Sequence, residues 1–250
     1  MVRFLKTLAL VAVLFTAAHP PAAAAEKSQG TPQGTPLTVV ELFTSQGCSS
    51  CPPADAFLGE LAKRDDLLAL SVHVDYWDYI GWKDPFASPS NTQRQRDYAR
   101  KLRLRYVYTP QMVIQGAFQA TGSDRAKVLA SIEKAAKAKR VPVTIERKQG
   151  KIHVAIPGAP TTDEAAVWLV LFDGQHETAI RRGENGGRTL SYYNVVRKMI
   201  RIGTWSGREM KIPTGITGEM AAGRDGCGVI VQSLKTGRIL GAAKIDLNGT

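Results

Sequence analysis

The stretch Val39–Pro53 constrains the fold more than any other part of the sequence. An apolar run, 39–43, is followed by a short turn, by two cysteines, Cys48 and Cys51, and by a pair of prolines. The apolar run is typical of a buried strand, and prolines suit the first turn of a helix. The start of a helix offers unpaired N–H groups and a partial positive charge, and both stabilise a thiolate. The order strand, cysteine pair, helix therefore predicts a redox dithiol.

The N-terminal residues have the pattern of a secretory signal. Arg3 and Lys6 precede an apolar run at 8–18, and a small-residue tract ends at Ala25. Such a run is short for a membrane span, and an Ala-x-Ala site is typical of cleavage. We therefore expect residues 1–25 to be a cleaved signal peptide, a periplasmic or secreted protein, and no transmembrane segment after cleavage. An uncleaved membrane anchor is the alternative.

Net charge and compartment limit the partners. The sequence has 33 Lys and Arg residues against 22 Asp and Glu, a formal charge of +11. A basic exported protein is suited to an anionic envelope surface, although a merely basic, solvated surface is the alternative. We expect no nucleic acid partner in that compartment, and no motif predicts a cofactor. In an oxidising compartment Cys48 and Cys51 tend to form a disulfide, which leaves Cys227 unpaired.

Residues 26–36 are polar and predict a flexible lead-in, so the folded part begins near Leu37. Segment 37–140 alternates strands and helices, which predicts an α/β domain whose first two strands are parallel. The expected elements are strands at 37–43 and 67–75, helices at 53–63 and 91–105, a hairpin at 111–121, and a helix from Ser123 with Leu129, Ile132 and Ala136 on its inner face.

Segment 141–250 has a different pattern. Val141, Val143 and Ile145 alternate with polar residues, and a second alternating run follows the turn at Gly150. Such alternation predicts hairpins with one solvated face, so we expect a mainly antiparallel β module and an α+β protein overall. Further strand-like runs lie at 165–172, 177–182, 189–202, 209–212, 228–234 and 238–246.

Several other polar groups carry weaker hypotheses. His73, Asp75, Asp78 and Asp84 invite a metal site, but their spacing matches no recognised ligand pattern, so we expect none. The Gly-rich segment 181–188 lacks the ending of a phosphate-binding loop and predicts a hairpin tip. Cys227 is expected to be a buried, inert thiol, with exchange into the dithiol as the alternative. Six basic residues are expected on a solvated helix face: Arg94, Arg96, Arg100, Lys101, Arg103 and Arg105.

Seven short motifs stand out along the chain: Cys48–Asp55, His73–Trp77, Gly81–Trp82, Arg94–Arg96, Tyr108–Gln111, Arg182–Asn185 and Asn194–Val196. On these motifs, residues 37–138 resemble a thioredoxin-like domain. Nearly the whole mature chain resembles a family of bacterial secreted proteins known as a domain of unknown function with that fold.

The resemblance implies roles for individual residues. Cys48 is the attacking thiol, exposed at the turn, and Cys51 the covered, resolving one. Thr109 and Pro110 resemble the cis-proline segment that holds an extended substrate, with an ordinary trans turn as the alternative. Glu41 resembles the buried acid that accepts a proton from Cys51; an edge residue reaching solvent or a Lys partner is the alternative.

Two functions follow as hypotheses. The first is an exported thiol–disulfide oxidoreductase that acts on exported protein thiols or disulfides, with Tyr76, Trp77 and Trp82 at a substrate groove or merely packed over the site edge. The second is an envelope binding module in which the Cys48–Cys51 disulfide is structural. Half of a zinc site is the least supported reading, because no further ligand pair is present.

Overall fold

The N-terminal half folds around a parallel pair of strands. The computed structural model describes residue 2 and residues 36–148, 151–161, 163–213 and 223–248, so the expected signal peptide and most of the expected lead-in lie outside the described residues. Strands β1 (Thr38–Thr44) and β2 (Leu67–His73) are parallel because helix α1 (Pro52–Ala62) connects them. A hairpin, β3 (Gln111–Ile114) and β4 (Phe118–Thr121), runs antiparallel to β1 on its other side.

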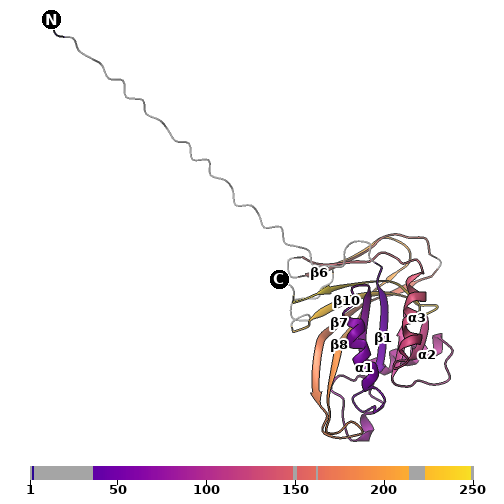
Figure 1. Cartoon of the computed structure of the whole chain (residues 1–250). Coiled ribbons are helices and arrows are strands. Elements are labelled where there is room, and N and C mark those ends of the chain that lie inside the picture. Colours follow the sequence, from indigo (N-terminus) through magenta and orange to yellow (C-terminus); the bar gives the residue numbers. More distant parts are fainter. Residues whose placement is uncertain (1, 3–35, 149–150, 162, 214–222, 249–250) are drawn as a thin grey trace.

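Strands from the C-terminal half extend the same sheet, as Figure 1 shows beside the indigo β1. They are β7 (Ala165–Ala179), β8 (Thr189–Trp205), β10 (Gly226–Ser233) and β11 (Ile239–Asp246), and the order is β11-β10-β7-β8-β2-β1-β3-β4. The junction is parallel, with Val195 opposite Ser71, and the Asn194 side chain donates a hydrogen bond to the Ala69 carbonyl at 2.9 Å. One mixed sheet therefore crosses the boundary that we expected near residue 140.

A smaller sheet covers part of the C-terminal half. It consists of β5 (Thr144–Lys148), β6 (Lys151–Ile156) and β9 (Met210–Pro213), in the order β5-β6-β9. Its inward residues, Ile145 and Val154 among them, pack with Leu169 and Val229 of the large sheet. Strand β7 is therefore covered on both faces, which explains why its first half is an unbroken apolar run rather than an alternating one.

Helices cover both faces of the N-terminal strands. Val40 and Leu42 point toward α1 and α3 (Arg125–Ala136), whereas Val39 and Phe43 point toward α2 (Pro89–Lys101). Glu41 shares the second face because side chains alternate along a strand. A short 3₁₀ helix, η1 (Asp78–Ile80), lies in the loop after β2.

The described residues thus form an α+β fold with a large mixed sheet and three α-helices, and in this part of the chain no helix is long and apolar enough to cross a bilayer. Two sequence expectations were wrong in detail. The runs expected at 165–172 and 177–182 are joined into one strand that ends at Ala179, because β8 pairs with β7 from end to end. The inner face of α3 is formed by Val128, Ile132 and Ala135, while Leu129 is exposed.

Candidate functional site at the disulfide turn

The two cysteines form a disulfide at the start of α1. Cys51 is the residue just before the helix, and its carbonyl accepts the amide N–H groups of Ala54 and Asp55 at 2.8 and 3.1 Å. Both cysteines are 0% exposed, whereas Ser49 and Ser50 between them are exposed. The expectation that Cys48 lies exposed at the turn is therefore wrong. The loop after β2 lies beside the neighbouring Gly47, since Ile80 and Trp77 lie within 3.2 Å of the position that a Cβ on Gly47 would occupy.

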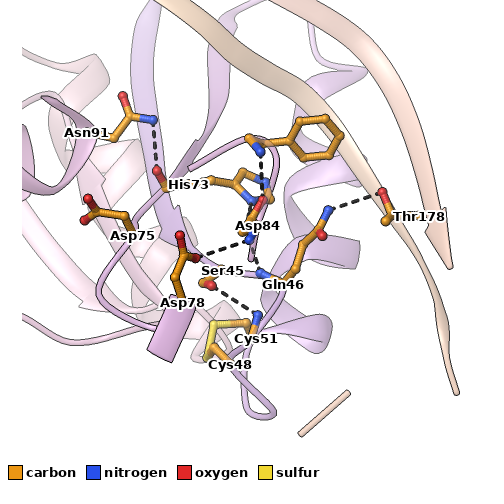
Figure 2. Close-up of polar contacts among 12 residues, drawn as sticks. Ser45, Gln46, Cys48, Cys51, His73, Asp75, Asp78, Asp84, Asn91 and Thr178 are labelled. Atoms are coloured by element: carbon orange, nitrogen blue, oxygen red, sulfur yellow. Dashed lines mark hydrogen bonds and ion pairs between the residues drawn. A yellow bond between two sulfur atoms is a disulfide. The ribbon is translucent and has the colours of Figure 1, made fainter. Parts of the chain in front are cut away.

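The turn between β1 and α1, residues 45–51, carries both cysteines and is called the disulfide turn. Three hydrogen bonds of Gln46 hold it in place. Its backbone N–H donates to Asp84 Oδ2 at 2.9 Å, and its side chain accepts from Trp82 Nε1 and donates to Thr178 Oγ1. Figure 2 shows Asp84 between His73 and this turn, with the disulfide at the turn's end. Because Trp82 belongs to the loop after β2 and Thr178 to β7, both halves of the chain position the cysteines.

The tip of the β7–β8 hairpin, segment 181–188, also holds the disulfide turn in place. Asn185 is fully buried, and its amide nitrogen donates to the carbonyl oxygens of Gln46 at 2.9 Å and Cys48 at 3.0 Å. Arg188 fixes the orientation of that amide by donating to Asn185 Oδ1 at 2.8 Å. The exposed Glu184 accepts the Ser49 amide N–H at 3.2 Å, and hydrogen bonding to Ser49 lowers the pKa of Glu184.

The expected substrate-binding residues lie beside this turn. Trp77 Nε1 donates to Thr109 Oγ1 at 2.8 Å, and the Tyr76 hydroxyl donates to buried Gln95. Burial raises the pKa of Tyr76 to about 12. The Thr109–Pro110 peptide is cis, as the resemblance implies. Pro110 is close to the start of α1, because a Cβ on Gly122 would lie 2.9 Å from Ala54 Cβ and 3.2 Å from Pro110 Cβ.

Asp55 is a buried carboxyl that sequence reasoning missed. It lies one helical turn after Cys51, a spacing that places both side chains on one face of α1. Neither of its carboxyl oxygens reaches hydrogen-bond geometry with any residue that the structure describes. Burial raises the pKa of Asp55 to about 7, while attraction to His73 and an interaction with the Thr44 hydroxyl oppose this rise.

The surroundings of Asp55 contain more polar groups of the same kind. Atoms there without a hydrogen-bond partner among the described residues include Thr44 Oγ1, His73 Nε2 and the Tyr192 hydroxyl. Thr44 and His73 are register neighbours on β1 and β2, and the His73 and Tyr192 rings are 4.8 Å apart. Burial, and then the charges of Asp55 and Asp84, raise the pKa of Tyr192. Unpaired buried polar groups are rare in folded proteins, so this cluster calls for a chemical explanation.

His73 and Asp84 form a buried pair. His73 Nδ1 lies 2.7 Å from Asp84 Oδ2, and both side chains are inaccessible to solvent. Burial alone would raise the pKa of Asp84, but attraction and hydrogen bonding to His73 hold it below the ordinary value. Asp75 instead accepts a hydrogen bond from Thr92, and Asp78 accepts the Asp84 amide N–H. Over the described ranges, no group of three or more His, Cys, Asp or Glu residues is arranged to hold a metal ion.

Glu41 is positioned differently from our expectation. Its carboxylate forms a two-pronged ion pair with Arg94, with Nε–Oε1 at 2.6 Å and Nη2–Oε2 at 3.0 Å, and also accepts from the Tyr98 hydroxyl. Arg94 was expected on a solvated helix face; this was wrong, because its side chain is only 10% exposed. Glu41 neither reaches solvent nor pairs with a Lys, the alternatives considered for it.

Cys227 lies in the core between the two sheets. Burial raises its pKa to about 12, which fits the expected inert thiol. Three residues that position the turn or approach it were absent from the predicted site: Gln46, Asp55 and Asn185. A signal existed for Asp55, since an acid next to Ala54 on the apolar side of a helix, four residues after a cysteine, must find a partner or stay neutral. Asn185 stood in a motif already noted, but its contact with the turn was not expected.

The fold and site thus define an α+β protein with a C-x-x-C disulfide at a helix start, held by loops from both halves. The chain belongs to the family described as protein of unknown function DUF1223, whose model matches residues 39–232. A structural-genomics crystal structure of a protein from Agrobacterium tumefaciens is 32% identical, with a TM-score of 0.73, over 91% of this chain and 98% of that one. HBP35 of Porphyromonas gingivalis is similar in fold alone, at 11% identity and a TM-score of 0.56, over 86% of this chain and 76% of that one. No curated protein matches.

Proposed function

We propose that this protein is an exported thiol–disulfide oxidoreductase, with residues 37–140 as a thioredoxin-like domain and Cys48 and Cys51 as its redox pair. One observation carries the proposal: the disulfide stands at the first turn of α1, and Asp55, a buried carboxyl with no hydrogen-bond partner among the described residues, follows one turn later. The unit β1-α1-β2, the hairpin β3-β4 antiparallel to β1, and α3 support the thioredoxin-like part. The exported location rests on the sequence pattern of residues 1–25.

The reaction exchanges two electrons between this disulfide and a partner dithiol. A partner thiolate attacks Cys48 Sγ, a mixed disulfide forms, and the Cys48–Cys51 bond breaks with Cys51 leaving as a thiolate. The carboxylic acid of Asp55 gives this thiolate its proton. The partner's second thiolate then attacks the partner sulfur of the mixed disulfide and releases Cys48, so the partner is oxidised and this protein reduced. A reductase runs the same steps in reverse, with Asp55 accepting the Cys51 proton.

We assign the proton transfer to Asp55 and not to Glu41. Both Glu41 oxygens are held by Arg94 and Tyr98, whereas the Asp55 oxygens have no such partner among the described residues. A carboxyl whose pKa is about 7 exchanges its proton near neutral pH, which is what general acid–base catalysis requires. Because Cys48 is covered, its surroundings must open before a partner sulfur reaches it.

The burial of both cysteines also supports the second candidate function, an envelope binding module with a permanent disulfide. A structural bond of this kind is typically buried and held by its surroundings, as Asn185 and Gln46 hold this turn. Under this alternative, the basic surface and the C-terminal strands contact a partner. The two candidate functions predict different reduction potentials for the Cys48–Cys51 disulfide.

The first experiment measures that potential. The mature protein is equilibrated in glutathione buffers of graded ratio, its thiols are alkylated, and the reduced fraction is read from the mobility shift. A potential between about −270 and −120 mV supports catalysis, whereas one below about −300 mV identifies a structural bond and overturns the proposal. The measurement is repeated with the Cys227→Ser variant, in which the third thiol cannot contribute to the shift.

A second experiment tests the roles of the two cysteines. With Cys51→Ser, the Cys48 thiolate is expected to attack disulfides of exported proteins and to accumulate mixed disulfides with them, while the partner's second sulfur leaves as a thiolate; a reductant releases the partners. Cys48→Ser is the matched control and is expected to trap few, because its remaining thiol lies inside the helix start. Equal trapping by both variants would contradict the assignment of Cys48 as the attacked sulfur.

A third experiment tests Asp55 through kinetics. Asp55→Asn is expected to slow reduction of the disulfide by dithiothreitol by about 10²-fold near neutral pH, as for the loss of other acid–base groups. It should also remove the inflection near pH 7 from the pH–rate profile. Glu41→Gln should keep that inflection. If Glu41→Gln lost the inflection and Asp55→Asn kept it, the proton transfer would belong to Glu41 instead.

A further inference from the structure

A cavity of about 520 Å³ lies between α2 and the strands β7, β8 and β10. None of the residues that line it belongs to the disulfide turn. From the helix it is lined by Gln93, Arg94 and Arg100, and from the sheet by Trp168, Met199 and Gln232. Its volume falls within the range of about 300–1,000 Å³ that is typical of small-molecule sites. The cavity is therefore large enough for a ligand that the disulfide chemistry does not use.

Arg94 is the polar group that distinguishes this cavity. Four of the five guanidinium N–H groups are used, on the two Glu41 oxygens, the Tyr98 hydroxyl and Gln232 Oε1. One hydrogen on Nη1 is left without an acceptor among the described residues. Because Glu41 holds the planar guanidinium rigidly, that N–H is preorganised as a donor for a ligand. A buried ion pair is weak evidence for stability, so its place beside a cavity favours a binding role.

The sheet side of the cavity is apolar. Trp168 and Met199 are partly buried and pack against the core on the α2 side of the sheet. The Arg94 Cζ atom lies 5.7 Å from the centroid of the Trp168 ring, so the indole and the guanidinium are close together. A flat ring in the cavity would meet an aromatic face, and the unbranched Met199 side chain adapts to its shape.

The charges around the cavity favour an anion. Its lining contains three cationic side chains, Arg94, Arg100 and Lys101, and one carboxylate, Asp97. The balance stays positive even when Glu41 beneath Arg94 is counted. Asp97 pairs with Arg100, whereas the Lys101 ammonium donates to two carbonyl oxygens, Leu234 at 2.7 Å and Lys235 at 3.0 Å, and so keeps its net charge.

From these features we propose that the cavity binds a small aromatic carboxylate. Its ring packs against Trp168 and Met199, and its carboxylate accepts the remaining Arg94 N–H near the positive charges of Arg100 and Lys101. The proposal does not depend on the redox function, because it uses none of the groups at the disulfide.

Titration calorimetry of the mature protein with 2-naphthoate tests the proposal. We expect a dissociation constant of about 1 mM or tighter, and binding of the neutral isostere 2-naphthamide weakened at least about tenfold. In wild type, 2-naphthoate should also change the tryptophan fluorescence, and Trp168→Phe should remove that change. No measurable heat with 2-naphthoate, or equal affinity for both probes, would overturn the proposal.

Variants on the exposed side of α2 locate the binding without disturbing the core. Gln93→Trp fills the cavity from the helix side and should abolish binding. Arg100→Gln should weaken it by about two- to fivefold, the usual effect of one exposed charge. Arg96→Gln is the matched control, because Arg96 is exposed on the same helix but does not line the cavity. Full binding by Gln93→Trp, or equal weakening by Arg96→Gln and Arg100→Gln, would place the probe elsewhere and overturn the proposal. Circular dichroism confirms that each variant is folded.

Discussion

Two buried carboxyl groups, Glu41 and Asp55, lie on opposite sides of strand β1 and have opposite surroundings. Glu41 faces α2, where Arg94 and Tyr98 satisfy both of its oxygens. Asp55 lies on α1, with no hydrogen bond of good geometry to any described residue. Burial is nearly complete for both, so partners rather than depth separate them. Glu41 is therefore held in an ion pair with Arg94, while Asp55 keeps the ability to gain and lose a proton.

The largest expected effect comes from breaking the Glu41 pair. Arg94→Met leaves a buried carboxylate without its cation and should cost about 3–5 kcal/mol in the free energy of unfolding. Urea unfolding at neutral pH measures it. Arg96→Met, an exposed change on the same helix, should stay within about 0.5 kcal/mol. Equal stability of the two variants would mean that Glu41 does not depend on Arg94, and the contrast between the two carboxyl groups would no longer hold.

The next effect should depend on pH and belongs to Asp55. Its pKa rises from 3.8 to about 7 on folding, so between these values the folded state binds more protons than the unfolded state, and wild-type stability falls as the pH rises. Asp55→Asn lacks this penalty and should be more stable than the oxidised wild type by about 4 kcal/mol at pH 8. The difference should shrink toward pH 4.

Unfolding curves of oxidised wild type and Asp55→Asn at several pH values test this slope. Asp97→Asn, on the exposed face of α2, is the control for the loss of a surface carboxylate. A stability difference that does not vary with pH would mean that Asp55 has the same pKa in both states. The proton-transfer role would then lose its basis.

The third effect concerns the two hydrogen bonds by which Asn185 holds the disulfide turn. Asn185→Ala removes both hydrogen bonds to the Gln46 and Cys48 carbonyls, at an expected cost of about 1–3 kcal/mol. The loosened turn should also expose the disulfide to reduction, so dithiothreitol should reduce it faster. Asn248→Ala, at an exposed position, is the control for both measurements. An unchanged reduction rate in Asn185→Ala would show that the hairpin tip does not govern access to Cys48.

The sequence predicted the strand–helix–strand unit around the cysteines because its signals are local: apolar periodicity and two prolines. It did not predict the contrast between the two carboxyl groups. Arg94 stands among other basic residues on a polar helix, and its partner is 53 residues away. The gap between the expected runs at 165–172 and 177–182 is absent for a nonlocal reason, since pairing with β8 keeps β7 continuous to Ala179. Likewise, only the β7–β8 pairing brings Asn185 to the turn.

The smallest expected effect comes from the same substitution, Tyr to Phe, made on each side of β1. The Tyr98 hydroxyl donates to Glu41 and accepts from Arg94 and Gln232, whereas that of Tyr192 has no partner among the described residues. Tyr98→Phe should therefore cost about 1–2 kcal/mol and Tyr192→Phe less than about 0.5 kcal/mol, because removing an unpaired hydroxyl forfeits no hydrogen bond. Thermal and urea unfolding of the two single variants give the comparison. Equal costs would mean that the Tyr192 hydroxyl is hydrogen-bonded in solution, and that the groups around Asp55 are as well satisfied as those around Glu41.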